Sequence, residues 1–100
     1  MSNQSETNVL EKIDMKLHNL YNVIFFNDDI TPIGFVLQVL IDVFGHSKES
    51  AAKIIVNIES NGSGVVGTYI KSIAEAKVIL VRECAIKANY PLTVTMEKEG

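Results

Sequence analysis

The sequence predicts an α+β domain in which three helices pack on a small three-stranded antiparallel sheet, in the order β-α-α-β-α-β. Short segments that are rich in β-branched and aromatic residues, or that alternate between apolar and polar residues, indicate the strands. Longer segments in which apolar residues recur every three or four positions indicate the helices. The chain has 100 residues, 47% of them hydrophobic, which suits one domain with a core and leaves no room for a second.

Residues 1–20 are expected to form a flexible N-terminal extension, and residues 21–99 the folded domain. Residues 1–8 are polar. Residues 9–20 then carry apolar side chains at helical spacing, namely Val9, Ile13, Leu17 and Leu20. Because isolated helices of this length are marginal in water, this part is either a short helix or a flexible arm.

The first strand is predicted over residues 21–26 and ends at the turn Asn27-Asp28-Asp29. Thr31 is expected to cap the helix that follows, with Pro32 at its first position. Gly45 ends this helix, whose apolar positions are Phe35, Val36, Val39, Leu40, Val43 and Phe44.

A second helix is predicted to start at its N-cap, Ser47, and to end at Asn61-Gly62. Its buried residues are expected to be Ala51, Ile54, Ile55 and Ile58. Residues 65–70 form the second predicted strand.

The longest helix is predicted to begin at Ser72-Ile73-Ala74-Glu75, which has the form of a capping box. Its expected buried face comprises Ile73, Ala76, Leu80, Val81, Cys84, Ala85 and Ala88. Pro91 ends the helical stretch. Leu92, Val94 and Met96 then alternate with polar residues, which indicates a third, half-buried strand.

Composition excludes several classes of function. The formal net charge is −3 and no basic run occurs, which argues against a nucleic-acid partner. Neither a secretory signal, an organelle presequence nor a membrane-length apolar run is found, so a cytoplasmic protein without a membrane partner is expected. The single cysteine, Cys84, excludes an intramolecular disulfide and a thiolate metal site.

Residues 62–67 read Gly-Ser-Gly-Val-Val-Gly, a literal GxGxxG motif. A dinucleotide fingerprint follows a strand and opens a helix, whereas these glycines follow a predicted helix and lead into a strand. No cofactor is therefore predicted. His18 and His46 have no evident catalytic partners, so no enzymatic activity is predicted either.

The segment Asn27-Asp28-Asp29-Ile30-Thr31-Pro32 has two interpretations. It is a polar turn in which Asp29 and Thr31 satisfy backbone N–H groups at a helix start. It is alternatively a cation site, built from two acids and an amide. An ammonium group fits it better than a metal, because a dedicated metal site needs more oxygen ligands. A small enzyme that uses these acids with a divalent metal stays open as a further alternative.

The stretch from Tyr21 to Pro32, followed by Phe35-Val36, Val39-Leu40 and Phe44, resembles the ClpS adaptor family. Further matching residues are Gly62, Gly67-Thr68-Tyr69, the run from Ala74 to Val78, Pro91-Leu92 and Met96-Glu97. The resemblance spans residues 21–99 without a gap. It implies a fold similar to the C-terminal domain of the ribosomal stalk protein.

The resemblance also implies a function. ClpS adaptors bind the first residue of N-degron substrates, typically Leu, Phe, Tyr or Trp, and pass the substrate to the N-domain of a ClpA- or ClpC-type AAA+ ATPase for degradation. By position, the substrate N-terminus would be bound by Asn27, Asp28, Asp29, Thr31 and Glu59. Asn27 and Asp28 would contact the free α-amino group and the first peptide bond, and Asp29 and Thr31 would support the rim and the pocket wall. The apolar pocket would consist of Ile33, Val36, Ile55, Ile58 and Leu92. ATPase docking would use Glu75 and Lys77.

Four positions depart from the family pattern. Glu59 replaces a His that helps to hold the α-amino group, and as a carboxylate it could pair with an ammonium group directly. Ile33 replaces a flexible Met at the pocket entrance, Gly34 replaces an acid, and Ser72 replaces a docking Glu. The first three departures, Glu59, Ile33 and Gly34, motivate an alternative function, that of a ClpS-like regulator that docks on the ATPase but has lost or altered its degron specificity. Ser72 bears on the docking itself.

Overall fold

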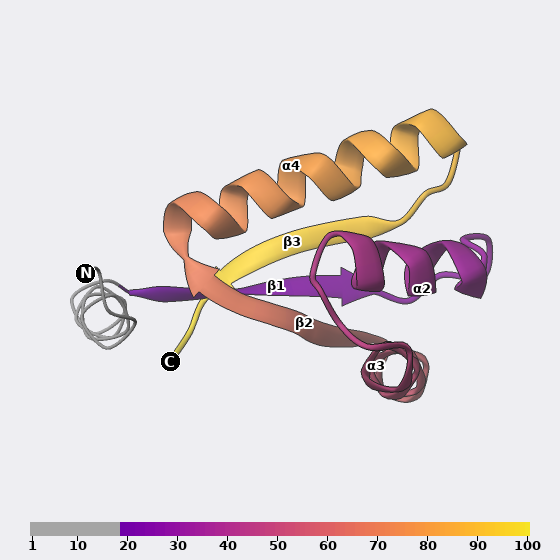
Figure 1. Ribbon diagram of the computed structural model, residues 1–100, viewed down its shortest axis with the longest axis horizontal. Helices are drawn as coiled ribbons and strands as arrows, with labels where there is room; N and C mark the ends of the chain where they lie inside the picture. The colour runs from indigo at the N-terminus through magenta and orange to yellow at the C-terminus, as the bar shows by residue number, and fades with distance from the viewer. Residues whose placement is uncertain (1–18) are drawn as a thin grey trace, which may run out of the picture.

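The computed structural model describes residues 19–100, so the predicted extension over residues 1–18 lies outside it. Three strands and three helices follow one another in the predicted order (Figure 1). They are β1 Leu20–Phe26, α2 Ile33–Asp42, α3 Lys48–Asn61, β2 Ser63–Ile70, α4 Lys71–Ala88 and β3 Thr93–Lys98. The predicted fold class is confirmed. Leu20, which the sequence assigned to the extension, is the first residue of β1.

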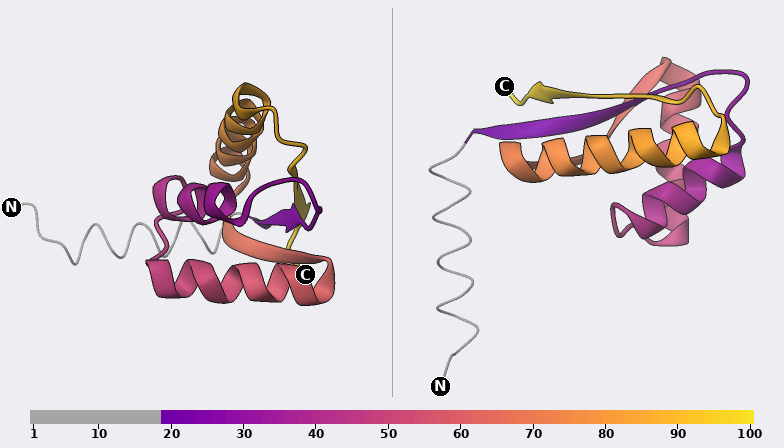
Figure 2. Two further views of the ribbon diagram at one scale, coloured as in Figure 1. Left: turned by 90° about the vertical axis from the view of Figure 1, so that its right-hand side faces the viewer. Right: turned by 90° about the horizontal axis from the view of Figure 1, so that it is seen from above.

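The sheet has the strand order β2-β1-β3, and both pairings are antiparallel. Its central strand is β1, the first in the chain, which is flanked by the two later strands. A register shift between Val23 and Ile24 interrupts the pairing of β1 with β2. The strands form one layer, and the helices lie on one side of it (Figure 2).

The core lies between this covered face of the sheet and the helices. Val23 and Phe25 of β1 are fully buried, as expected for alternating residues of a strand with one covered face. Phe25 packs edge-to-face on Phe44 beyond α2, with 5.6 Å between ring centroids. On the opposite face, the Thr68 hydroxyl donates to the Asn22 side chain across the β1–β2 pair.

The predicted ends of α3 are confirmed, whereas the predicted start of α2 is wrong. Ser47 caps α3 by accepting a hydrogen bond from Ser50 N, and Gly62 ends that helix with φ +87°. The N-cap of α2, however, is Pro32 rather than Thr31. The Thr31 hydroxyl is instead used within the preceding loop, where it donates to Asp28.

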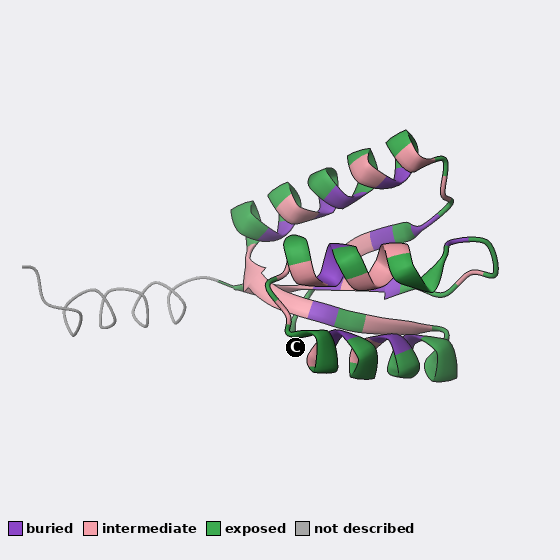
Figure 3. Ribbon diagram, turned by 45° about the vertical axis from the view of Figure 1, so that its right-hand side comes forward, coloured by how far each residue is buried: buried purple, intermediate pink, exposed green. Residues whose placement is uncertain are grey.

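The predicted capping box of α4 and part of its predicted buried face are also wrong. The helix begins at Lys71, directly after β2, with Ile70 as its N-cap. Its buried residues are Ala74, Val78, Val81 and Ala85. Ile73 and Leu80 remain 45% and 46% exposed, and green and purple alternate along α4 accordingly (Figure 3). Because β2 leads into α4 without a loop, the strand sets the rotation of the helix, and Ala74 and Ala85 are among the residues turned to the core.

Candidate functional site

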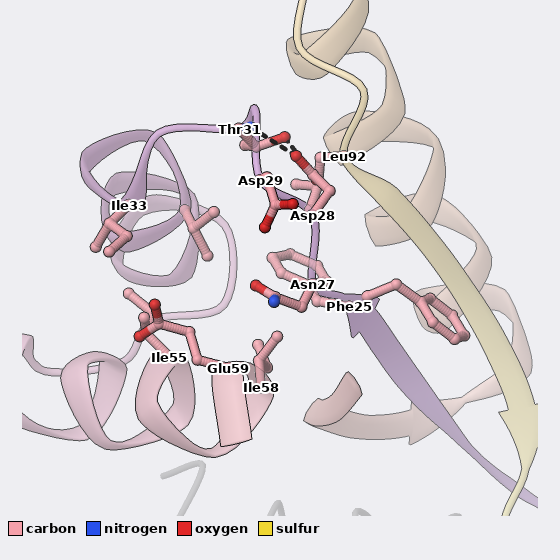
Figure 4. Close-up of a pocket in the computed structure, with 12 residues that line it drawn as sticks. Phe25, Asn27, Asp28, Asp29, Thr31, Ile33, Ile55, Ile58, Glu59 and Leu92 are labelled. Atoms are coloured by element: carbon pink, nitrogen blue, oxygen red, sulfur yellow. Dashed lines mark hydrogen bonds between the residues drawn. The ribbon is translucent and has the colours of Figure 1, made fainter. Parts of the chain in front are cut away.

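A cavity of about 260 Å³ lies where the end of β1, the β1–α2 loop, α2, α3 and the residue before β3 meet (Figure 4). The structure places around it all ten residues that the resemblance assigned to the substrate N-terminus and the apolar pocket. The lining consists of Phe25, Phe26, Asn27, Asp28, Asp29, Thr31, Ile33, Val36, Ile55, Ile58, Glu59 and Leu92.

The walls of the cavity are apolar. Ile55 and Ile58 are three positions apart on α3 and share one helical face, and both are buried. Val36 comes from α2, and the buried side chain of Leu92 comes from the segment before β3. Ile33, the first residue of α2, is 56% exposed and stands at the mouth. A side chain that enters the cavity would therefore contact hydrocarbon on the sides formed by α2, α3 and Leu92.

The mouth is formed on one side by the β1–α2 loop, residues 27–32, which Asp28 holds in shape. The Asp28 carboxylate accepts hydrogen bonds from Ile30 N at 2.8 Å and from Thr31 N at 2.6 Å. It accepts a third from the Thr31 hydroxyl at 2.8 Å. Asn27 N donates to Gly62 O at 2.8 Å, which ties the start of the loop to the end of α3.

These hydrogen bonds determine the ionisation of Asp28. Burial by itself raises the pKa of this carboxyl group, but the hydrogen bonds from Thr31 and Ile30 outweigh burial and leave the pKa below its ordinary value. Asp28 is therefore ionised at neutral pH, and the N–H and O–H donors of its own loop stabilise its negative charge.

Asn27 and Asp29 are arranged differently from Asp28. Their side chains point into the cavity in Figure 4, and among the described residues that line it, side-chain hydrogen bonds join only Thr31 and Asp28. Glu59, on α3, stands across the mouth, with its carboxylate toward Ile33. The mouth thus offers an amide and a carboxylate on one side and a second carboxylate on the other. Such groups suit a ligand with a positive charge beside an apolar side chain.

The alternative of a small enzyme that uses the loop acids with a divalent metal bears on the grouping of possible ligands. Within residues 19–100, no three His, Cys, Asp or Glu side chains are grouped closely enough to hold a metal ion. His46 has a structural contact, since its Nε2 lies 2.6 Å from Val66 O. Among the described helices, none has the length and apolar character needed to cross a membrane.

The two residues predicted to dock the ATPase lie in the first turns of α4. This helix follows β2 directly, and Ile70 pairs with Leu20, so Glu75 and Lys77 lie near the start of β1, whereas the cavity lies at its end. Glu75 is exposed. The Lys77 ammonium group donates to Val43 O at 2.7 Å and lies 5.1 Å from the centroid of the Tyr69 ring.

Phe25 and Phe26 line the cavity but were not predicted to do so. They directly precede Asn27 in β1, so their position at the end of the central strand was the available signal. The Phe25 side chain points away from the cavity in Figure 4 and packs in the core.

Comparisons with known proteins agree with this architecture. Residues 16–95 match the family model of the ATP-dependent Clp protease adaptor protein ClpS. The chain is 45% identical to the ATP-dependent Clp protease adapter protein ClpS of Maricaulis maris over 84 residues, covering 84% of this chain and 77% of that one. It is 38% identical to the protein of the same name from Acetivibrio thermocellus over 98 residues, covering 95% and 99% of the two chains.

A solved structure is similar as well. Agrobacterium tumefaciens ClpS2 bound to L-phenylalaninamide matches with a TM-score of 0.78 and 36% identity, over 81% of this chain and 98% of that one. Sequence, fold and site therefore lead to one assignment: the chain belongs to the ClpS family of Clp protease adaptors.

Proposed function

We propose that this protein binds the N-terminal residue of substrate proteins when that residue is Leu, Phe, Tyr or Trp, and delivers them to a Clp AAA+ ATPase–protease. The observation that carries the proposal is the division of the cavity into apolar walls and a polar mouth into which Asn27 and Asp29 point. A protein N-terminus has the complementary groups, because its α-ammonium group and its first side chain are attached to the same carbon atom.

The size of the cavity supports a single side chain as its occupant. Its volume of about 260 Å³ is below the roughly 300–1,000 Å³ of clefts that hold drug-sized ligands. Burying a Leu or Phe side chain contributes about 1.5–3 kcal/mol. Each hydrogen bond to a charged group contributes about 1.5–3 kcal/mol, so a micromolar affinity, about −8 kcal/mol, is within reach after the cost of association.

The residues at the mouth have two roles, since some contact the substrate and others hold the loop in shape. Asn27 and Asp29 bind the α-ammonium group and the first peptide bond, since their side chains point into the cavity. Asp28 and Thr31 hold the loop that presents them. A carboxylate has about four acceptor sites, and Asp28 uses three of them within the loop, so one is left for the substrate.

The ligand of the similar ClpS2 structure supports this mode of binding. L-phenylalaninamide combines a free α-amino group, a benzyl side chain and a carboxamide in place of the rest of a polypeptide. These three groups match the polar mouth, the apolar cavity and the open side of the site in this protein.

The experiment is a comparison of peptides with and without a charged N-terminus. Fluorescence anisotropy should give micromolar Kd values for peptides that begin with Leu or Phe. Their N-acetylated forms should bind at least tenfold more weakly, because acetylation leaves Asp29 without a cation. Equal binding of the two forms, or no binding to any of the four first residues, contradicts the proposal. The second outcome, combined with retained ATPase binding, favours the regulator with lost or altered specificity.

Delivery forms the second half of the proposal and takes place in the cytoplasm. The N-domain of a ClpA- or ClpC-type ATPase docks on α4, where Glu75 and Lys77 are its contact residues. Because Lys77 already holds Val43 O, the exposed Glu75 offers the cleaner test. Glu75→Lys should abolish binding to the isolated N-domain in calorimetry and leave peptide affinity unchanged. Unchanged N-domain binding would show that Glu75 is not part of the docking surface.

A further inference from the structure

Glu59 stands at the side of the mouth where the chain of a bound substrate would continue. It follows Ile55 by one turn of α3, so its side chain rises above an apolar wall of the cavity. Glu59 itself is exposed. In Figure 4 its carboxylate lies on the side of Ile33, across the cavity from Asn27 and Asp29.

The geometry of a bound N-terminal residue shows what would reach Glu59. Under the proposed function, the α-ammonium group lies beside Asn27 and Asp29, and the first side chain fills the cavity. The bonds of the α-carbon are tetrahedral, so its carbonyl carbon must leave in a third direction. With the ammonium group beside Asn27 and Asp29, the side of the mouth that carries Ile33 and Glu59 is left for the chain. The second residue of the substrate therefore lies beside Glu59.

The charges of the mouth leave Glu59 available to this second residue. The lining contains Asp28, Asp29 and Glu59, and it contains no Lys, Arg or His. Asp28 is bound to the donors of Ile30 and Thr31. The α-ammonium group of the substrate pairs with Asp29. One carboxylate, that of Glu59, then faces the substrate without a cation from the residues that line the cavity.

We propose that Glu59 makes this protein prefer substrates whose second residue is Lys or Arg. The apolar stem of such a side chain packs on Ile33, which is 56% exposed, while its charged end pairs with the Glu59 carboxylate. This inference rests on the proposed function, because it requires the N-terminal residue to occupy the cavity.

The expected size of the preference is that of an exposed ion pair. Such a pair changes affinity by about two- to fivefold. A peptide with Glu as its second residue is disfavoured by a similar factor, because two carboxylates then face each other. In 1 M salt, where the Debye length falls to about 3 Å, the preference disappears.

The experiment uses three peptides that begin Phe-Lys, Phe-Gln and Phe-Glu and are otherwise identical. Their Kd values are measured by anisotropy with the native protein, with Glu59→Gln and with Glu59→Lys. Glu83→Gln serves as the matched control, because it removes an exposed carboxylate from α4, outside the lining of the cavity. The native protein and Glu83→Gln should prefer Lys over Gln over Glu. Glu59→Gln should bind all three alike, and Glu59→Lys should reverse the order.

Two outcomes overturn the inference and leave the proposed function intact. Equal binding of the three peptides by the native protein shows that Glu59 does not contact the second residue. An equal loss of affinity for all three peptides in Glu59→Gln shows that Glu59 binds the α-ammonium group instead. Failure of the native protein to bind any of the three contradicts the proposed function itself.

Discussion

The two loops that flank α2 use their polar groups in opposite ways. In the loop after α2, Val43 O accepts from Lys77 and His46 Nε2 contacts Val66 O. Ser47 caps the next helix. In the loop before α2, Asp28 is the side chain that binds the backbone, while the side chains of Asn27 and Asp29 point into the cavity.

The difference shows how a ligand site is recognised in a small domain. Both loops are polar, and both connect regular elements, so polarity does not distinguish them. What distinguishes them is whether the polar groups are needed by the fold. Asp28 and Asp29 are adjacent and chemically identical, yet the first accepts the hydrogen bonds of its loop, whereas we propose that the second binds the ligand. The four predictions below test this division, beginning with the largest effect.

Asp29→Asn should weaken binding of a Phe-initiated peptide about ten- to hundredfold without lowering the Tm. It removes a charged acceptor of the substrate ammonium group, which contributes about 1.5–3 kcal/mol, and it removes no hydrogen bond from the loop. Anisotropy and thermal unfolding measure the two effects. Asp42→Asn is the control, because it removes an exposed acid from the other end of α2. Equal affinities of the native protein and Asp29→Asn would show that a group other than Asp29 binds the α-ammonium group of the substrate.

Asp28→Ala should lower both stability and peptide affinity. It leaves Thr31 N–H and the Thr31 hydroxyl without their acceptor, and Thr31 is only 9% exposed. The expected loss in the free energy of unfolding is about 1–3 kcal/mol, measured by urea denaturation. Asp28→Asn, which can still accept from the two backbone N–H groups, should lose less. A fully stable Asp28→Ala protein would show that the loop does not need this carboxylate.

Lys77→Met should lower stability by about 1–2 kcal/mol and leave peptide affinity unchanged. The substitution keeps the apolar stem but removes the hydrogen bond to Val43 O and the cation held near the Phe44 and Tyr69 rings. A domain of this size should then lose roughly 4–8 °C in Tm per kcal/mol. Weakened peptide binding in this variant would mean that the loop after α2 contributes to the site.

Acidification should have the smallest effect and should act through Asp28. The pKa of this group is lowered on folding, so its contribution to stability is present above the ordinary value of 3.8 and is lost as pH falls through the folded-state pKa. The Tm of the native protein should therefore fall more steeply below about pH 4 than that of Asp28→Asn. Parallel Tm profiles of the two proteins would contradict this role.

Much of the fold could be predicted from the sequence because its signals are local. The glycines and capping residues at Gly45, Ser47 and Gly62 mark helix ends through their own backbone and side chains. The rotation of α4 could not be predicted, because apolar residues occur on several sides of this helix. Ile73 and Leu80 looked suitable for the core, but Ala74 faces the sheet since β2 leads directly into the helix.

The candidate site, too, has a part that could be predicted from the sequence and a part that could not. Ten of the twelve residues that line the cavity followed from the resemblance, position by position, and Phe25 and Phe26 did not. The resemblance gave the amine to Asp28 and the support of the rim to Asp29, whereas in the structure Asp28 is the carboxylate that accepts from Thr31 N–H, because the backbone path of the loop decides which carboxylate reaches it. The start of α2 depends on the same contact, since Thr31 is held by Asp28 and the N-cap moves to Pro32.

The most direct measurement is a titration of ¹⁵N-labelled protein with L-phenylalaninamide and with its N-acetylated form, followed by amide chemical shifts. The free amine should perturb residues 27–31 and residues 55–59 of α3, leave residues 43–47 unchanged, and bind far more tightly than the acetylated form. Equal perturbations by both compounds, or shifts centred on residues 43–47, would contradict the claim that the loop before α2 binds a charged N-terminus.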